Sequence, residues 1–154
     1  MTKNNFKTRR GFTLIEVMVA AVVFILAFVG ILISYLKCLE LNEFAKNSSL
    51  AVSVSQSRLE KIKNIRNKPF NQIKATYNNV TFTSNELTGI GVSYIDDSNP
   101  KLLKITVTFC WQQSNRRVIG EDQNLNGQLN VNEDKNANGI LDSPTTLVSY
   151  IYDR

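Results

Sequence analysis

A twelve-residue unit rich in oxygen-bearing side chains occurs twice in the last third of the sequence. Both copies begin with Glu-Asp, at Glu121 and at Glu133, and continue with Asn, Asn-Gly and Leu at the same offsets. Carboxylate, carboxamide and backbone carbonyl oxygens are the donors that Ca²⁺ prefers, and a glycine at the sixth position of such a loop permits its sharp turn. The repeat therefore predicts a pair of structural calcium loops.

The first loop starts at Asp122 and has a donor at every position that a twelve-residue oxygen cage needs. Its twelfth position is Glu133, whose carboxylate would close the cage. The candidate ligands of this loop are Asp122, Asn124, Asn126, the carbonyl of Gln128, Asn130 and Glu133, with Gly127 at the turn. We expect this loop to bind one Ca²⁺ ion.

The second loop starts at Asp134 and departs from the pattern at its end, where the twelfth position holds Thr145 instead of a carboxylate. We expect Asp142, at the ninth position, to compensate directly. The candidate ligands of this loop are Asp134, Asn136, Asn138, the carbonyl of Ile140 and Asp142, with Gly139 at the turn. One or two structural Ca²⁺ ions are therefore expected. The alternative is a polar loop of Asx turns that binds no metal.

Apolar helices do not flank these loops in the sequence, so a calcium sensor built from paired helices is not expected. The loops resemble EF-hand-like calcium loops without helices, such as those of dockerin- and thrombospondin-like repeats. Asn replaces Asp at several positions, and fewer charges imply weak binding, with a Kd on the order of 10⁻⁴–10⁻³ M as in extracellular modules. The ion would cross-link an insert, residues 120–143, that has few apolar side chains to bury.

A different carboxylate, Glu16, lies near the start of a long apolar run that extends from Leu14 to Leu36. A bilayer core of about 30 Å needs about 20 helical residues, so the run can span a membrane. The cationic leader before it predicts a cytoplasmic N-terminus, and contains Lys3, Lys7, Arg9 and Arg10. A lone charge at mid-bilayer costs about 2.5–3.5 kcal/mol, so the placement of Glu16 indicates a functional role.

The junction Gly11-Phe12-Thr13-Leu14-Ile15-Glu16 resembles the prepilin leader junction of type IV pilins and type II secretion pseudopilins. The resemblance implies that a membrane-embedded prepilin peptidase cuts after Gly11 and that the new N-terminal Phe12 is methylated. It also implies that Glu16 pairs with the Phe12 amine of a neighbouring subunit during assembly. Read without the motif, the run fits a cleaved secretory signal or a plain anchor, but it exceeds a secretory apolar region in length, and a plain anchor leaves Glu16 unexplained.

The composition limits the remaining possibilities. A chain of 154 residues provides one modest domain in addition to the apolar helix. The leader holds four of the 18 basic residues, and the other 14 nearly balance 13 acidic ones, so the net charge of +5 does not predict nucleic-acid binding. Absence of histidine excludes histidine chemistry, and no nucleophile–base pair is visible, so an enzyme is not expected. Cys38 and Cys110 are expected to be buried free thiols, with a disulfide between them as the alternative.

The apolar run is predicted to begin one long helix, from about Phe12 to about Arg66. The sequence has no proline before Pro69, and a residue that precedes proline disfavours helix. The second half of the helix carries small and apolar residues at three-, four- and seven-residue spacings, namely Leu41, Ala45, Ser48, Val52, Leu59, Ile62 and Ile65.

Residues 67–78 are expected to form a loop, and strand signals follow at 80–83, 87–95, 101–111 and 147–152. In the second of these, Gly89 and Gly91 predict a bulge or a weak strand. The third has the clearest alternation and one apolar face that should pack on the helix, made of Leu103, Ile105, Val107, Phe109 and Trp111. Arg116 and Arg117 are expected at a solvated turn after it.

A helix followed by a small antiparallel sheet predicts an α+β fold. The strand that ends at Trp111 and the final strand resemble the C-terminal hairpin of minor pilins and pseudopilins. The family resemblance implies a pilin-like fold, in which the first half of a long N-terminal spine helix is embedded in the membrane. Three regions are expected: a leader at 1–11, a transmembrane or filament-core segment at 12–36, and a head at 37–154.

The resemblance implies a structural subunit of minor pilin or pseudopilin type in a type IV pilus or a type II secretion pseudopilus. Its partners would be other such subunits, the prepilin peptidase, the filament assembly platform and the membrane. It would cross the bacterial inner membrane once, N-terminus in the cytoplasm, before it enters an extracytoplasmic filament. The alternative is a membrane-tethered calcium-dependent adhesin or binding module that is not assembled into a filament.

Overall fold

The structure is a computed structural model that describes residues 11–65 and 68–152. Most of the predicted leader, residues 1–10, and the predicted end of the helix at Arg66 lie outside the described residues. The chain divides into two compact units, Met1–Leu41 and Asn42–Arg154, which are described separately.

The helix α1 (Leu14–Lys63) begins two residues after Phe12 and runs unbroken through the predicted apolar segment. Thr13 caps its start, because the Thr13 side-chain oxygen accepts a hydrogen bond from the backbone N–H of Glu16 at 3.3 Å. In its N-terminal half, Ser34 Oγ donates to the carbonyl of Gly30 at 2.9 Å, and the helix continues through both residues. The helix therefore starts where the sequence predicts.

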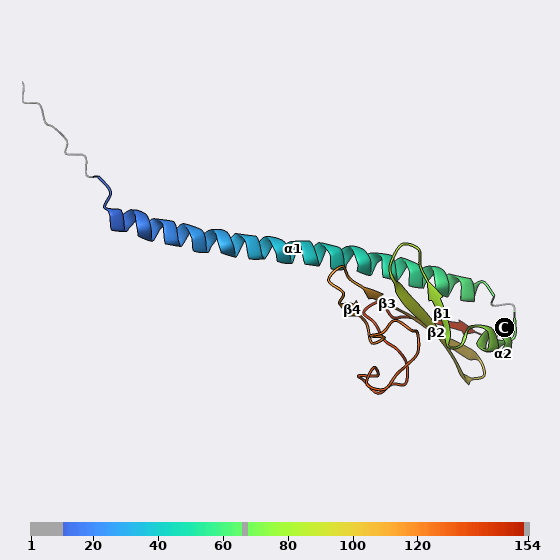
Figure 1. Cartoon of the computed structure of the whole chain (residues 1–154). Helices are drawn as coiled ribbons and strands as arrows, with labels where there is room; N and C mark the ends of the chain where they lie inside the picture. Colours follow the sequence, from blue (N-terminus) through green and yellow to red (C-terminus); the bar gives the residue numbers. More distant parts are fainter. Residues whose placement is uncertain (1–10, 66–67, 153–154) are drawn as a thin grey trace, which may run out of the picture. The chain divides into compact units, whose positions relative to one another are not determined.

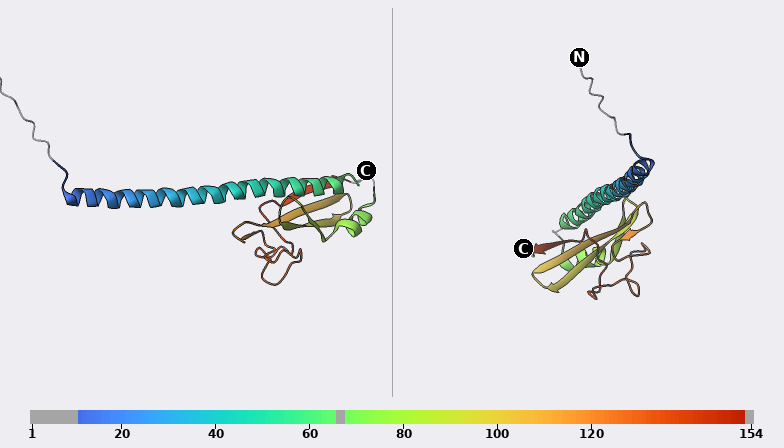
Figure 2. Two further views of the ribbon diagram at one scale, coloured as in Figure 1. Left: turned by 45° about the horizontal axis from the view of Figure 1, so that its top comes forward. Right: turned by 90° about the vertical axis from the view of Figure 1, so that its left-hand side faces the viewer.

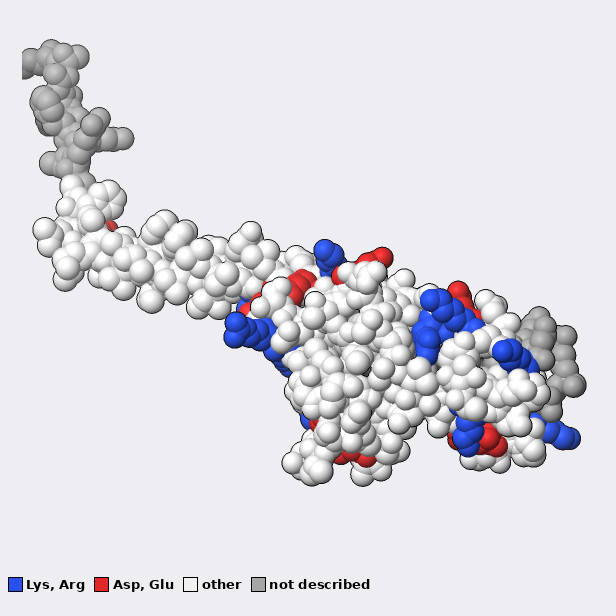
Figure 3. Space-filling model, turned by 45° about the vertical axis from the view of Figure 1, so that its right-hand side comes forward, with Lys and Arg blue, Asp and Glu red and all other residues white. Residues whose placement is uncertain are grey.

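In the N-terminal unit, the apolar side chains of α1 are exposed. Phe24 is 72% exposed and Ile31 is 65% exposed, and the surface of this segment shows little charge in Figure 3. Of the helices that the structure describes, α1 is long and apolar enough to cross a membrane, by length and composition. An apolar surface of this size does not stay in water, so the segment needs lipid or protein around it.

The C-terminal unit combines the last part of α1 with a short helix, α2 (Phe70–Tyr77), and an antiparallel sheet (Figure 1). The strands are β1 (Val80–Thr83), β2 (Gly89–Asn99), β3 (Leu102–Gln112), β4 (Val118–Ile119) and β5 (Leu147–Tyr152). In the described part of the chain β3 is central: it pairs with β2 along one edge and with β4 and β5 along the other. The predicted α+β arrangement of a long helix and a small antiparallel sheet is confirmed.

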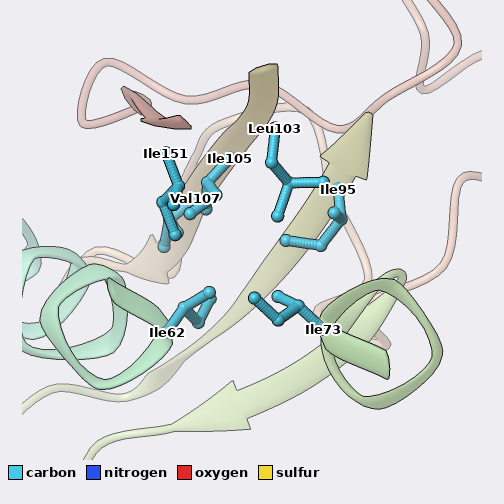
Figure 4. Packing of buried hydrophobic residues seen from close by; sticks show 7 residues of the cluster. All are labelled: Ile62, Ile73, Ile95, Leu103, Ile105, Val107 and Ile151. Carbon is cyan, nitrogen blue, oxygen red and sulfur yellow. The ribbon is translucent and has the colours of Figure 1, made fainter. Parts of the chain in front are cut away.

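The apolar face of β3 packs against α1, as predicted. One buried cluster joins helix and strand residues at one end of the sheet (Figure 4): Ile62, Ile73, Ile95, Leu103, Ile105, Val107 and Ile151. A second cluster, at the other end, brings Ala51 of α1 to Phe109 and Trp111 of β3. Two further views show the sheet along the last part of α1, with the segment between β4 and β5 on the side of the sheet away from it (Figure 2).

The buried face of α1 is only partly the predicted one. Ile62 is fully buried, as expected, but Leu41 is 67% exposed, and Ala45 is exposed as well. The helix buries Ala51 and Ser55 instead. Small side chains at these positions let the helix backbone approach the large rings of β3, a requirement that apolar spacing does not reveal.

Two other predictions are wrong. Residues 70–77 form the helix α2 and not a loop, because Ile73 anchors this short turn in the core beside β2. Gly89 and Gly91 lie in regular strand, and the register shift of β2 occurs between Asp96 and Asn99. A Cβ at Gly91 would collide with the ring of Phe82, so this glycine makes room for packing.

Candidate functional site

The repeated insert leaves and rejoins one edge of β3. In an antiparallel pair of strands, the residue numbers of two paired residues always add to the same sum, which defines the register. The sum is 230 where β3 pairs with β4, as in Trp111 with Ile119, and 254 where it pairs with β5, as in Val107 with Leu147. The two sums differ by twice the length of the twelve-residue repeat. An even difference preserves which side chains face the core, so β4 and β5 are two pieces of one hairpin strand, separated by the insert.

If β4 and β5 were joined into one continuous strand, each residue of that strand would have a fixed partner on β3. The residues on either side of the insert already lie opposite those partners. Thr145 Oγ1 donates to the carbonyl of Phe109 at 3.2 Å. Thr146 Oγ1 lies 3.0 Å from Thr108 Oγ1. A Cβ at Gly120 would meet the Cys110 side chain. The insert is therefore residues 121–144, two complete twelve-residue units, which shifts the predicted bounds of 120–143 by one residue.

The insert covers the face of β3 that points away from α1. Thr106, Thr108 and Cys110 alternate with the core residues and are buried even though two of them are polar. Burial raises the pKa of the Cys110 thiol to about 11. Cys110 is a buried free thiol, as predicted, whereas Cys38 is exposed and not buried as expected.

Each loop is shaped by its leading aspartate. Asp122 accepts hydrogen bonds from the backbone N–H groups of Asn126, at 3.1 Å, and Gly127, at 2.7 Å. Asp134 accepts the same pair from Asn138, at 3.0 Å, and Gly139, at 2.9 Å. The glycines have φ values of +71° and +78°, a region that glycine adopts without strain. The two loops thus fold alike.

The carboxamides at the third and fifth positions continue this pattern. In the first loop, Asn124 Oδ1 accepts from the N–H of Asn126 at 3.0 Å, and Asn126 Oδ1 accepts from that of Gln128 at 2.7 Å. The second loop repeats both bonds one unit later, at 3.1 and 3.0 Å. These bonds hold the side-chain oxygens of alternate residues on the inside of each turn.

Three oxygens of the first loop converge on one nitrogen. Asn130 Nδ2 lies 3.3 Å from Asn126 Oδ1, 3.0 Å from the carbonyl of Gln128 and 3.1 Å from Glu133 Oε2. These oxygens are the predicted donors at the fifth, seventh and twelfth positions. A carboxamide nitrogen has two protons to offer, so it cannot satisfy all three. Asn126 Oδ1 and Glu133 Oε2 also accept backbone N–H groups, from Gln128 at 2.7 Å and from Asn130 at 3.0 Å. The three oxygens are of the kind that hard cations prefer.

The second loop gathers its donors around Asp142. Asp142 Oδ2 accepts from Asn136 Nδ2 at 2.8 Å and from Asn138 Nδ2 at 2.7 Å. The predicted ninth position therefore lies beside the third and fifth. Thr145, at the twelfth position, is buried and donates to Phe109, so it takes no part in the loop. The role of the Ile140 carbonyl as a ligand stays a prediction.

Three of the five carboxylates of the insert are buried, and in the described chain none of the five forms an ion pair. Asp122 is fully buried, and Glu121 and Glu133 are 8% and 6% exposed. Within residues 11–65 and 68–152, ion pairs form between Lys37 and Glu40 and between Lys74 and Asp97, and neither includes an insert carboxylate. Buried charges are normally paired or bound to metal.

Burial alone pushes the pKa of Glu133 upward. Hydrogen bonds from Asn130, Gln123 and Asn124 more than offset this, and the pKa lies below its ordinary value. The Glu133 carboxylate is therefore held in its charged form.

The described residues contain no group of three or more His, Cys, Asp or Glu side chains arranged to hold a metal ion. The reason lies in the donor types: most candidate ligands here are carboxamides and backbone carbonyls. In the first loop the structure brings together three of the candidate oxygens, those of Asn126, Gln128 and Glu133, and the metal site stays a prediction. The sequence interpretation missed Glu121, whose carboxylate reaches into the second loop; its position as the first residue of the repeat was the available signal.

The second candidate site is the processing motif in the N-terminal unit. Gly11, Phe12 and Thr13 precede α1 in non-helical backbone, and Phe12 is 82% exposed. Glu16 lies exposed in the first turn of the helix. The bond between Gly11 and Phe12, where cleavage is predicted, and the Glu16 carboxylate are therefore both accessible in the isolated chain.

Comparison with known families supports this motif. The family model of the prokaryotic N-terminal methylation motif matches residues 6–32. No curated protein and no solved structure gives a significant match. The motif supports a type IV pilin-like family and a prepilin-like substrate of a type IV pilus or secretion system. Together with the apolar helix it suggests a membrane-anchored protein.

Proposed function

We propose that the protein is a structural subunit, of minor pilin or pseudopilin type, of a type IV pilus or a type II secretion pseudopilus. The observation that carries this proposal is the match to the methylation motif at residues 6–32, which includes the start of an exposed apolar helix. Peptidase cleavage after Gly11 would free the Phe12 amine. The apolar half of α1 would then move from lipid into the filament core, which covers the same surface.

Glu16 gives this transfer its specificity. A carboxylate alone in lipid costs free energy, whereas one that faces the Phe12 amine of a neighbouring subunit is paired. The pair would fix the register of neighbouring helices, because a shift by one helical turn would separate the charges. The role is structural, as in the pilin-like family, and needs no catalytic group.

We further propose that the head is stabilised by Ca²⁺ in the two insert loops. The support is the twofold occurrence of the ligand pattern, the three oxygens that converge on Asn130 Nδ2, and the buried carboxylates without cationic partners in the described chain. Asp122, Asn126 and Glu133, with the Gln128 carbonyl, would hold an ion in the first loop. The ion would supply the positive charge that these oxygens otherwise lack.

Filament assembly is tested by fractionation of cells that express the protein with its peptidase and assembly platform. We expect the wild type in sheared filaments and Glu16→Ala retained in the membrane fraction, processed but unassembled. Glu40→Ala is the matched control, since Glu40 is an exposed glutamate on the same helix that pairs with Lys37; it should assemble normally. An uncut wild-type protein confined to the membrane would instead support the tethered binding module.

A further inference from the structure

We infer that Glu121, which precedes both loops, is the carboxylate that closes the second loop, so that the two calcium sites form a closed pair. The inference rests on the calcium binding proposed above. It assigns the second site a ligand from the opposite end of the insert, in place of Thr145 at its expected end. The surroundings of Glu121 and of Glu133 carry this assignment.

Glu133 closes the first loop through two backbone groups. Its Oε1 accepts from the N–H of Gln123 at 3.0 Å, and its Oε2 accepts from the N–H of Asn130 at 3.0 Å. Glu121 does the same in the second loop. Its Oε1 accepts from the N–H of Lys135 at 3.1 Å, and its Oε2 accepts from the N–H of Asp142 at 3.0 Å.

These contacts occupy equivalent positions of the two repeat units. Lys135 lies twelve residues after Gln123, and Asp142 lies twelve residues after Asn130. Glu121 therefore stands to the second loop as Glu133 stands to the first. In a longer array, the glutamate that opens each unit would close the preceding loop; here the last loop has no following unit, and the first glutamate takes that place.

A backbone hydrogen bond also holds Glu121 at the second loop. The N–H of Glu121 donates to the carbonyl of Asp142 at 2.8 Å, which brings the two ends of the insert together. Thr145 is unable to compete, because its hydroxyl is buried and directed to Phe109 and Ser143. Glu121 is thereby the one carboxylate, besides Asp134 and Asp142, that the described structure brings to the second loop.

The arrangement also couples the sites. Glu121 is adjacent in sequence to Asp122, the leading ligand of the first loop, and Glu133 is adjacent to Asp134, the leading ligand of the second. Each loop is therefore closed by the residue that positions the start of the other. An ion in either loop would order a ligand of its neighbour.

The test is isothermal titration of the full-length protein in detergent micelles with Ca²⁺ alone. We expect two ions for the wild type and for Thr145→Val. Glu121→Gln and Glu133→Gln should each bind one ion at the concentration that saturates the wild type, with the affinity of the affected site lowered by about tenfold or more. Glu86→Gln is the matched control, because Glu86 is exposed and lies outside the insert.

An ion count unchanged by Glu121→Gln, or loss of an ion in Thr145→Val, overturns the role of Glu121. A wild type that binds no Ca²⁺ overturns the calcium proposal itself, so the two failures are distinguishable. If Glu121→Gln does not fold, as judged by near-ultraviolet circular dichroism, Glu121→Asp is measured instead. That variant keeps the charge but is one methylene shorter, and it must weaken the second site more than the first; equal affinities to those of the wild type at both sites overturn the role of Glu121.

Discussion

Asn130 is the side chain around which the first loop closes. Its Nδ2 group occupies the convergence point of three oxygens, from Asn126, Gln128 and Glu133. The carboxamide supplies partial positive charge where an ion would supply full charge. The three oxygens keep lone pairs that an ion would use once Asn130 turns its own oxygen inward.

Asn130→Asp tests this reading at the scale of one residue. The substitution removes the donor and places a second carboxylate beside Glu133, so the calcium-free head should melt at a lower temperature than the wild type. Affinity for Ca²⁺ should rise, because affinity increases with the number of ligand charges. Thermal melts with and without calcium, and titration calorimetry, measure both effects.

Asn85→Asp is the control for the added charge, since Asn85 is exposed and lies between β1 and β2, outside the insert. It should change neither the calcium-free melting temperature nor the affinity. An Asn130→Asp protein with unchanged calcium affinity would contradict the role given to the first loop.

At the scale of elements, the insert interrupts one hairpin strand and can be removed without a change in the register of that strand. The pairings of β4 and β5 with β3 differ in register by two lengths of the repeat, and Gly120 and Thr145 already face neighbouring positions of β3. The core lies on the other face of β3, against α1 and α2. The fold of the head should therefore not depend on the insert for its core.

Deletion of residues 121–144 tests whether the rest of the head folds without the insert. Gly120 would then connect to Thr145, and β4 and β5 would form one strand opposite Phe109 and Cys110. We expect a folded head with a cooperative thermal transition and no calcium binding. The deletion exposes the second face of β3, so some loss of stability is expected.

Deletion of residues 121–143, which keeps Pro144, is the matched comparison. An odd-numbered deletion moves β5 by one position, and a one-residue slip turns every side chain to the opposite face. Ile151 would leave the core, and the transition should broaden or disappear. Equal stability of the two deletion variants would contradict the common register of β4 and β5.

The elements differ in how far the sequence could predict them. The strands at 80–83 and 147–152 were predicted with the bounds that the structure shows, because β-branched and aromatic residues cluster there. The helix α2 was missed, since a short segment with one buried residue, Ile73, has little periodicity to detect. The face of α1 was offset for a related reason: burial of Ala51 and Ser55 follows from the partner strand and not from their own polarity.

The same division applies to the candidate sites. The ligands of the first loop and the processing motif are local patterns, and spacing along the chain was enough to propose them. The contact of Glu121 with Asp142 joins residues 21 positions apart, and depends on the hairpin that returns the chain to β3. Local spacing cannot reveal such a closure, whereas the register of two strands can.

At the scale of the whole molecule, the proposal assigns different tasks to the two units. The N-terminal unit carries the motif and the apolar helix that a membrane or a filament core would cover. The C-terminal unit carries the sheet and the insert. An ion that binds only the folded head stabilises it by RT ln(1 + [Ca²⁺]/Kd), about 1.4 kcal/mol per site at a tenfold excess over Kd, so an extracellular calcium level would set the stability of the head.

The assembly proposal depends on one covalent event, cleavage between Gly11 and Phe12. Without it, the Phe12 amine that is to meet Glu16 of a neighbouring subunit does not exist. The residue types at the junction, the match over residues 6–32 and the exposed start of α1 all favour this event.

Mass spectrometry of the N-terminus of the protein recovered from sheared filaments tests this claim most directly. The account predicts a chain that begins at Phe12 and carries one methyl group on its α-amine. A chain in the same material that still begins at Met1 would contradict it, because an unprocessed leader leaves Glu16 without its partner.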